Sequence, residues 1–301
     1  MYDFLQVITL KVVFSAQKPG NLPPYLGSTI RGILGHCFRE FVCHTPEVKC
    51  FCCEQRADCL YVRNFSNTGG EGGAINPFVI HSVTEGKTQW EVGDDCIFEL
   101  NIFGRSALSP GIYLDALIAM QQKGWGVERI PFTLKSITET DSGKLIYAAG
   151  RTWGRNLIQH PMKIECRTSK AALIAFDTPV RIVSGKGLFD DLPFQQLIRF
   201  LVRRFSLVTQ VYTDYTLDWN LEELLEKASE VRTLAQEWNT INFTRYSMNH
   251  KDNKLELPSK KGWALYEGAM SSFVPILEVG KYLQVGKNTT IGFGHFEVFY
   301  D

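Results

Sequence analysis

The segment LEVGKYLQVGKNTTIGFGHFEV, residues 277–298, carries the densest group of structural signals in the chain. A short apolar helical pattern leads into a loop containing Gly286, Gly292 and Gly294, and alternating apolar residues then predict a closing strand. Because glycine allows close approach of the backbone, such a loop can present N–H groups to an anion. The side chains expected to assist are Lys287, Asn288, Thr289, Thr290 and His295.

A nucleotide-binding P-loop is one alternative for this segment, because GKNTT is close to the G-K-[ST] end of that motif. The full motif requires glycine at position 281 and Ser or Thr at position 288, where this chain has Lys281 and Asn288. The mismatch argues against nucleotide hydrolysis. A plain glycine-rich hairpin remains the other alternative.

Composition indicates a soluble globular protein. The chain has 301 residues, of which 45% are hydrophobic and 21% charged, enough for one large domain or two smaller ones. Lys plus Arg equals Asp plus Glu at 32 each, so any basic surface must be local. No apolar run approaches the roughly 20 residues of a membrane span, and the N-terminal residues do not have the pattern of a signal peptide. We therefore expect no membrane partner and a cytoplasmic location.

The first half of the chain predicts strands and helices in alternation. Alternating apolar residues over 3–16 predict a strand, and apolar spacings of three and four over 26–41 predict an amphipathic helix. The further elements expected are strands over 78–83 and 96–104, a helix over 110–122, and strands over 132–138 and 144–149. This order is the βαββαβ signature of a ferredoxin-like fold. The Gly-rich stretch 67–77 is expected to be a mobile connection.

A second unit begins near Met162. Its expected strands are 173–176, 180–182, 242–247, 263–270 and 293–300, and its expected helices are 193–208, 221–238 and 273–283. The sequence therefore predicts an α+β protein of two tandem ferredoxin-like domains, residues 1–160 and 161–301. A cysteine-rich insertion over about 43–59 belongs to the first.

Five of the eight cysteines lie within residues 43–59. Cys50 and Cys53 have the spacing of a zinc knuckle, and Cys43 and Cys59 stand on either side, so these four are candidate ligands of a structural zinc. Reduced thiols without metal, an iron–sulfur centre or a disulfide remain as alternatives. Four thiolates would leave no open position on zinc, so this site would be structural and not catalytic.

Five motifs occur in an order that resembles one known family. They are PYLGSTIRGILGH (24–36), CLYV (59–62) after the cysteines, RYS (245–247), GWALYEG (262–268) and LEVGKYLQVGKNTTIGFG (277–294). Together they resemble the repeat-associated RNA-processing endoribonucleases of CRISPR systems, members of the RAMP superfamily. The last motif is the most specific of the five.

The resemblance implies two RRM-type domains that cleave precursor CRISPR RNA within its repeat, with no metal or other cofactor in catalysis. In that family the RNA 2′-hydroxyl attacks the adjacent phosphate and leaves a 2′,3′-cyclic phosphate and a 5′-hydroxyl. The Gly-rich loop helps to hold the RNA. The implied partner is repeat RNA in the form of a stem-loop, with other CRISPR effector subunits as further candidates.

The resemblance places catalysis at a histidine in or just after the first helix. His36 and His44 both qualify, because an imidazole with a pKa near 6.5 can move the protons of this reaction. Lys49 and Tyr25 are candidate assistants, and His295 is a third candidate histidine. Each histidine has the alternative of a surface or packing role.

Other expected RNA contacts are basic or aromatic. These are Arg31, Arg199, Arg203, Arg245 and Tyr246. Solvated surface charge, a salt bridge or core packing are the alternatives. The competing function for the whole chain is a non-catalytic RAMP subunit that binds guide RNA in a CRISPR effector complex.

Overall fold

The computed structural model describes residues 2, 4–66, 75–185, 187–246 and 254–301. The described chain forms two compact units. The first consists of Asp3–Pro161 with Val211–Thr213, and the second of Met162–Gln210 and Asp214–Asp301 with Tyr2. Each is α+β, with its own sheet and its own apolar core.

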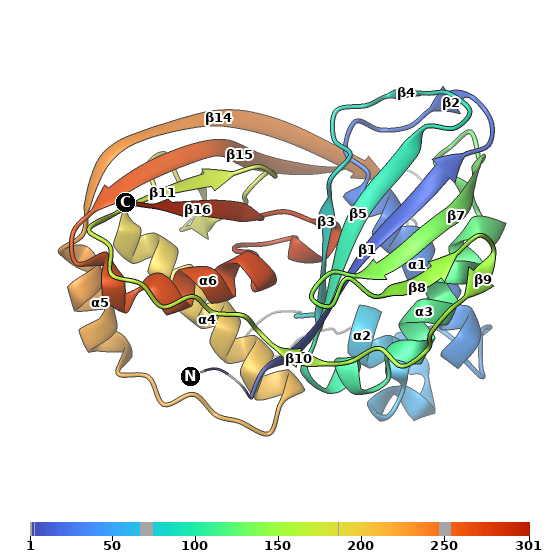
Figure 1. Ribbon diagram of the computed structural model, residues 1–301, viewed down its shortest axis with the longest axis horizontal. Coiled ribbons are helices and arrows are strands. Elements are labelled where there is room, and N and C mark those ends of the chain that lie inside the picture. Colours follow the sequence, from blue (N-terminus) through green and yellow to red (C-terminus); the bar gives the residue numbers. More distant parts are fainter. Residues whose placement is uncertain (1, 3, 67–74, 186, 247–253) are drawn as a thin grey trace. The chain divides into compact units, whose positions relative to one another are not determined.

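The first unit is built on a large antiparallel sheet (Figure 1). Its strands run in the order β3 (Phe78–Ser82), β5 (Asp95–Phe103), β1 (Gln6–Ala16), β7 (Ile130–Glu139), β8 (Leu145–Ala148) and β9 (Arg151–Thr152). Short strands add to it or pair beside it: β10 (His160–Pro161) with β1, β6 (Gly124–Trp125) with β7, and β2 (Gly20–Asn21) with β4 (Gln89–Trp90).

The helices of the first unit pack through aromatic side chains. They are α1 (Gly27–Val42), α2 (Leu60–Phe65) and α3 (Pro110–Ala119), with 3-10 turns η1 (Cys50–Cys52), η2 (Glu54–Ala57), η3 (Gly104–Leu108) and η4 (Met120–Gln122). The ring of Phe38 on α1 lies 5.0 Å from Phe65 of α2 and 5.0 Å from Tyr113 of α3. Burial of this face explains the apolar spacing of α1 and confirms the predicted helix.

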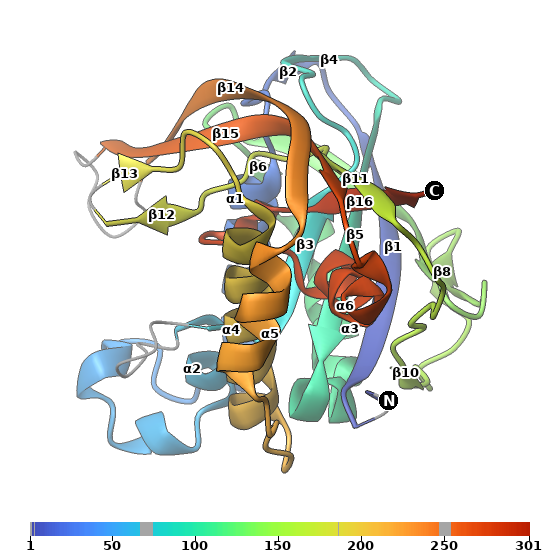
Figure 2. The same ribbon diagram turned by 90° about the vertical axis from the view of Figure 1, so that its left-hand side faces the viewer.

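The second unit has a four-stranded antiparallel sheet with its helices on one side (Figure 2). The strand order is β14 (Arg232–Tyr246), β15 (Lys254–Glu267), β11 (Ala171–Phe176) and β16 (Phe296–Tyr300). The helices are α4 (Phe194–Tyr212), α5 (Leu221–Ser229) and α6 (Val274–Leu283), with turns η5 (Met270–Ser272) and η6 (Thr289–Ile291) and a hairpin of β12 (Val183–Ser184) and β13 (Gly187–Leu188). Phe194 of α4 packs 5.0 Å from Tyr266 of β15, which joins helix and sheet in one core.

Two predictions in the second unit are wrong, and two further strands have ends that differ from those expected. The helix expected over 221–238 ends at Ser229, and β14 begins at Arg232, because residues 232–246 pair with β15. Residues 180–182 do not form a strand and make a single bridge, Val180 to Lys260. The strands expected over 263–270 and 293–300 are present with other ends: β15 ends at Glu267 and β16 begins at Phe296.

Two further expectations concern mobility and membranes. Of the Gly-rich stretch 67–77, residues 67–74 lie outside the described chain. Among the helices that are described, none is both long enough and apolar enough to cross a membrane.

Candidate active site

His36 lies on the exposed side of α1, one helical turn before Glu40. Glu40 Oε1 accepts a hydrogen bond at 2.7 Å from Nζ of Lys123, the residue that follows η4. Partial desolvation lowers the pKa of His36 below 6.5; the cations Lys123, Arg39 and Arg129 lower it further, and Glu40 opposes them. The imidazole is therefore mainly neutral at pH 7, the form that accepts a proton.

His44 and Lys49 lie in the cysteine-rich segment that follows α1. Both side chains are exposed, and His44 lines the hollow around which the cysteines gather. Lys49 Nζ lies 5.9 Å from the ring centroid of Phe51. Tyr25, just before α1, is buried with 7% of its surface exposed. The roles proposed for these three residues stay predictions.

Four half-buried cysteines surround one hollow of 690 Å³ in the first unit: Cys43, Cys50, Cys53 and Cys59. All eight cysteines of the chain are described, and each is a free thiol. In the described chain no three of the four sulfur atoms lie within 4.8 Å of one another. The donor set fits zinc by its chemistry, and a metal would have to draw the sulfurs together.

Arg31 faces the end of α2. Its guanidinium donates a 2.6 Å hydrogen bond to the carbonyl of Phe65 and lies 5.6 Å from the centroid of that ring. These contacts join α1 to α2, so Arg31 has a structural task whether or not it also contacts RNA.

The Gly-rich loop between α6 and β16 directs most of its N–H groups inward. Lys287 N–H donates to the carbonyl of Arg181 at 2.8 Å and Gly294 N–H to that of Pro179 at 2.8 Å. The N–H groups of residues 291–293 donate to carbonyls of residues 288 and 289. These N–H groups are therefore paired within the protein, and RNA binding by the loop stays a prediction.

The glycines of this loop are required by the backbone. Gly286, Gly292 and Gly294 have φ values of +88°, +94° and +80°. A Cβ at Gly294 would come within 1.9 Å of the Val285 carbonyl oxygen. Of the side chains expected to bind RNA, that of Lys287 is exposed, those of Asn288 and Thr290 are half-buried, and that of Thr289 is buried.

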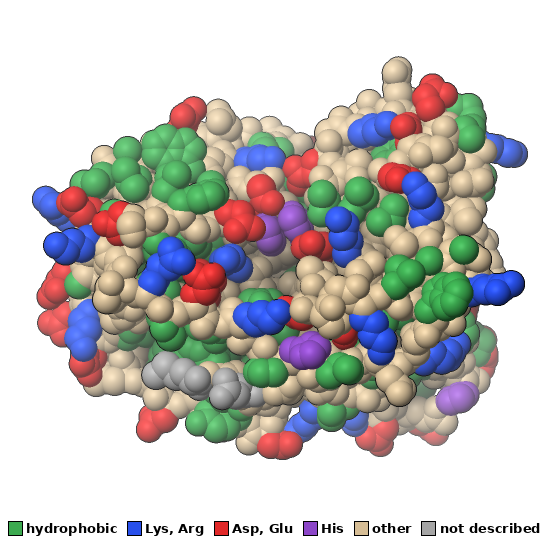
Figure 3. Space-filling view, viewed as in Figure 1, with side chains coloured by type: hydrophobic (Ala, Val, Ile, Leu, Met, Phe, Trp, Pro, Cys, Tyr) green, Lys and Arg blue, Asp and Glu red, His purple; other side chains and the backbone are tan. Residues whose placement is uncertain are grey.

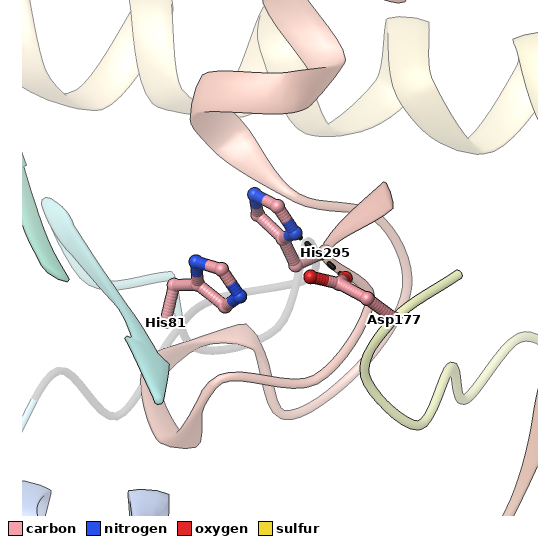
Figure 4. A group of neighbouring side chains, drawn as sticks. All are labelled: His81, Asp177 and His295. Carbon is pink, nitrogen blue, oxygen red and sulfur yellow. Dashed lines mark hydrogen bonds and ion pairs between the residues drawn. The ribbon is translucent and has the colours of Figure 1, made fainter. Parts of the chain in front are cut away.

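His295 is held by the start of the loop that follows β11 (Figure 4). Its Nδ1 lies 2.7 Å from Asp177 Oδ1, and its main-chain N–H donates to Thr178 Oγ1 at 2.9 Å. The ring is 9% exposed, so a carboxylate fixes a nearly buried imidazole. His81, also labelled in Figure 4, belongs to the first unit, where its Nδ1 lies 3.5 Å from Glu99 Oε2.

The basic residues expected on the second unit lie on α4 and β14. Arg199 and Arg203 are exposed and four residues apart on α4. Arg245 and Tyr246 end β14, and their side chains lie outside the description. On the face shown in Figure 3, Lys and Arg are mixed with Asp and Glu.

Sequence reasoning missed Lys123, Arg129 and Asp177. Lys123 and Arg129 act on His36 from a turn more than eighty residues away in sequence, and Asp177 meets His295 across 118 positions. Only Glu40, four residues after His36 in a predicted helix, had a local signal.

Two family models match different parts of the chain. Residues 174–296 match the family model of CRISPR-associated endoribonuclease Cas6, and residues 5–162 match a family model described as an N-terminal domain. An uncharacterised protein of Archaeoglobus fulgidus is 23% identical over 288 residues, which cover 92% of this chain and 93% of the relative.

Solved structures share the fold at low sequence identity. A chain of a partial Cas6-RT-Cas1–Cas2 complex matches with a TM-score of 0.65 and 12% identity, covering 99% of this chain. This chain spans only 47% of that longer one. Cas6 of Thermus thermophilus, in a product complex, matches with a TM-score of 0.60 and 15% identity over 97% of this chain and 100% of the other. Over residues 174–296 the chain is therefore similar to the Cas6 family of CRISPR-associated endoribonucleases, and its fold is shared with solved Cas6 structures.

Proposed function

We propose that this protein cleaves precursor CRISPR RNA within its repeat by 2′-hydroxyl attack, without a catalytic metal. The observation that carries the proposal is His36, an exposed imidazole whose pKa is lowered by partial desolvation and by Lys123, Arg39 and Arg129. A neutral imidazole beside cations combines a proton acceptor with groups that favour an anionic transition state.

His36 takes the proton of the 2′-hydroxyl in the first step. The 2′-oxygen then forms a bond to phosphorus while the bond from phosphorus to the 5′-oxygen breaks. The 5′-oxygen leaves as a hydroxyl after taking a proton from water, and the other fragment keeps a 2′,3′-cyclic phosphate. Negative charge grows on the non-bridging oxygens during the attack, and the positive potential of the cations around His36 offsets it without a direct contact.

Two ferredoxin-like domains of the RRM type are the proposed scaffold. Support comes from the order of the four central strands in each sheet, β3-β5-β1-β7 and β14-β15-β11-β16, with antiparallel neighbours. Along the chain, a helix follows the first and the third of the four strands in both units: α1 and α3 in the first unit, α4 and α6 in the second. Exposed Arg199, Arg203 and Lys287 are the described cations of the second unit that we assign to RNA contact.

Cleavage of repeat RNA in the presence of EDTA tests the reaction. We expect a 2′,3′-cyclic phosphate on one product and a 5′-hydroxyl on the other, and no cleavage of RNA carrying a single 2′-deoxy substitution at the cut position. His36→Ala should lower the rate about 10²–10⁴-fold, and His44→Ala should leave it near that of the unchanged protein. Equal rates for both variants would remove His36 from the mechanism.

The same experiment distinguishes the proposed reaction from the competing functions. A protein that binds repeat RNA tightly yet gives no cyclic phosphate under any pH between 5 and 9 would be a guide-holding RAMP subunit. Cleavage that stops with EDTA and returns with an added divalent ion would instead indicate a metal-dependent nuclease.

A structural zinc held by Cys43, Cys50, Cys53 and Cys59 is a separate part of the proposal. Four half-buried thiols around one hollow support it. We expect one zinc per chain after dialysis, and loss of that zinc in Cys53→Ser with a lower unfolding temperature. Cys166→Ser, at an exposed cysteine of the second unit, is the matched control. A metal content of zero in freshly prepared protein would refute this part alone.

A further inference from the structure

A shallow hollow of 430 Å³ lies in the first unit between the end of β1 and the turn that precedes β7. Three cations line it, Lys18, Lys123 and Arg129, against a single acid, Glu128. No role in the proposed reaction depends on the hollow itself. Its charge, in a chain with equal numbers of acidic and basic residues, marks it as an anion site.

The one acid of the hollow is already engaged. Glu128 Oε2 accepts the main-chain N–H of Asn21 at 3.0 Å, and Oε1 accepts Asn21 Nδ2 at 3.3 Å. Gly20 permits this approach, because a Cβ there would lie 2.7 Å from Glu128 Oε2. Both carboxylate oxygens therefore accept hydrogen bonds from Asn21 in β2, so Glu128 has a structural role.

Two of the three cations are positioned by their backbone. Lys123 follows η4, which packs against α1 and β7. Arg129 has φ = +53°, a left-handed conformation that ends the tight turn begun at Gly126, whose carbonyl accepts the Arg129 N–H at 3.4 Å. Such a conformation is uncommon for a residue with a side chain and is often found at functional sites.

The hollow shares two of its cations with the surroundings of His36. Lys123 and Arg129 line it and also act on the pKa of His36. Lys123 Nζ is held at 2.7 Å by Glu40, one turn after His36 on α1, and its side chain is 33% exposed. A cation that faces both a hollow and the proposed general base can contact a ligand that extends from one to the other.

We propose that this hollow binds the RNA phosphodiester that adjoins the scissile one, through Lys123 and Arg129 with Lys18 at its edge. The inference rests on the proposed function for the position of the scissile phosphate. An adjoining phosphate held here fixes the direction and register of the strand across His36, the usual contribution of phosphate contacts. Lys123 then has two anionic partners, Glu40 from the protein and a phosphate from the RNA.

Binding measured without cleavage tests the subsite. The probe is repeat RNA with a 2′-deoxy nucleotide at the cut position, in which each linkage near the cut is replaced in turn by an uncharged methylphosphonate. One linkage next to the cut should weaken binding to the unchanged protein about tenfold. In Lys123→Ala/Arg129→Ala the same replacement should have no further effect, because the partner charges are absent.

The control variant is Lys135→Ala. Lys135 is an exposed lysine of the same unit held at 2.7 Å by a carboxylate, that of Asp95, and it does not line the hollow. It should keep the full methylphosphonate effect. Circular dichroism of each variant establishes that it is folded.

The outcomes separate this inference from the proposed function. Coupling here means that the effect of a methylphosphonate on binding is lost in Lys123→Ala/Arg129→Ala. Coupling confined to the linkage beside the cut supports the subsite, whereas coupling at the scissile linkage itself, or at no linkage, overturns it. Should the unchanged protein fail to cleave any repeat RNA, the proposed function fails, whereas coupling to one linkage would still establish a phosphate site in the hollow.

Discussion

At the scale of single residues, His36 depends on groups that surround it in space more than on its neighbours in sequence. Partial desolvation lowers its pKa most, Lys123, Arg39 and Arg129 lower the pKa further, and Glu40 raises it. A general base must be neutral, so the cleavage rate should fall as the pH falls through the pKa of His36. Because that pKa is lowered, the fall begins below pH 6.5.

Replacing Lys123 by Ala should move this fall to higher pH. The change removes a cation and leaves Glu40 without its 2.7 Å partner, and both effects raise the pKa of His36. Single-turnover rates with enzyme in excess, measured from pH 5 to 9, report the shift without the effect on binding. Glu40→Gln should move the fall in the opposite direction, and shifts of the same sign in both variants would contradict the assignment.

Gly294→Ala should destabilise the second unit by more than about 2 kcal/mol. Its φ of +80° disfavours a side chain, and the added Cβ would meet the Val285 carbonyl oxygen at 1.9 Å. Urea unfolding measures the loss. At Gly187 no atom lies within 4 Å of an added Cβ, so Gly187→Ala should stay within about 0.5 kcal/mol of the unchanged protein.

Sequence reasoning identified His36 as a candidate because its position on a predicted helix and a motif both pointed to it. It could not find Lys123, Arg129 or Asp177, whose roles arise from contacts across long stretches of chain. Nor could it tell which N–H groups of the Gly-rich loop are paired within the protein. Glycines needed for positive φ and for close backbone packing have the same letters as glycines that bind an anion.

At the scale of elements, α1 is the part whose sequence pattern and packing agree most closely. Phe38→Ala should cost about 3–5 kcal/mol, because the ring is 1% exposed and contacts both Phe65 and Tyr113. Thermal or urea unfolding checks it. Phe41 on the same helix is 53% exposed, so Phe41→Ala should change stability by no more than about 0.5 kcal/mol. Similar losses for both would show that the buried face is misassigned.

The junction of α5 and β14 shows why periodicity failed in the second unit. Leu221, Leu224 and Val231 continue a helical spacing through Leu234 and Trp238. The structure ends the helix at Ser229, and from Arg232 onward the backbone pairs with β15, where Arg232 lies opposite Glu267, 35 residues further along. Leu234 is 50% exposed and is not part of the core. A long-range strand pair outweighs a local pattern of this kind.

At the scale of the molecule, a chain with 32 basic and 32 acidic residues must bind RNA through local groups. We expect log Kd for repeat RNA to rise linearly with log salt, with a slope of about 2 if Lys18, Lys123 and Arg129 each displace the counterion of one single-stranded phosphate. Fluorescence anisotropy between 50 and 300 mM salt measures the slope. Lys123→Ala should reduce it by about 0.7, whereas a slope near zero for the unchanged protein would rule out phosphate contacts as the source of affinity.

The inward-facing Gly-rich loop also bears on how proteins of this kind are classified. Its glycines satisfy the packing of residues 285–294 against residues 179–181, a demand that holds whether or not a histidine is present on α1. A search that gives most weight to this segment will therefore gather proteins that share an architecture, with or without a histidine on the first helix. Separating nucleases from passive RNA holders requires scoring the helix position occupied here by His36 together with the distant lysine and arginine that tune it.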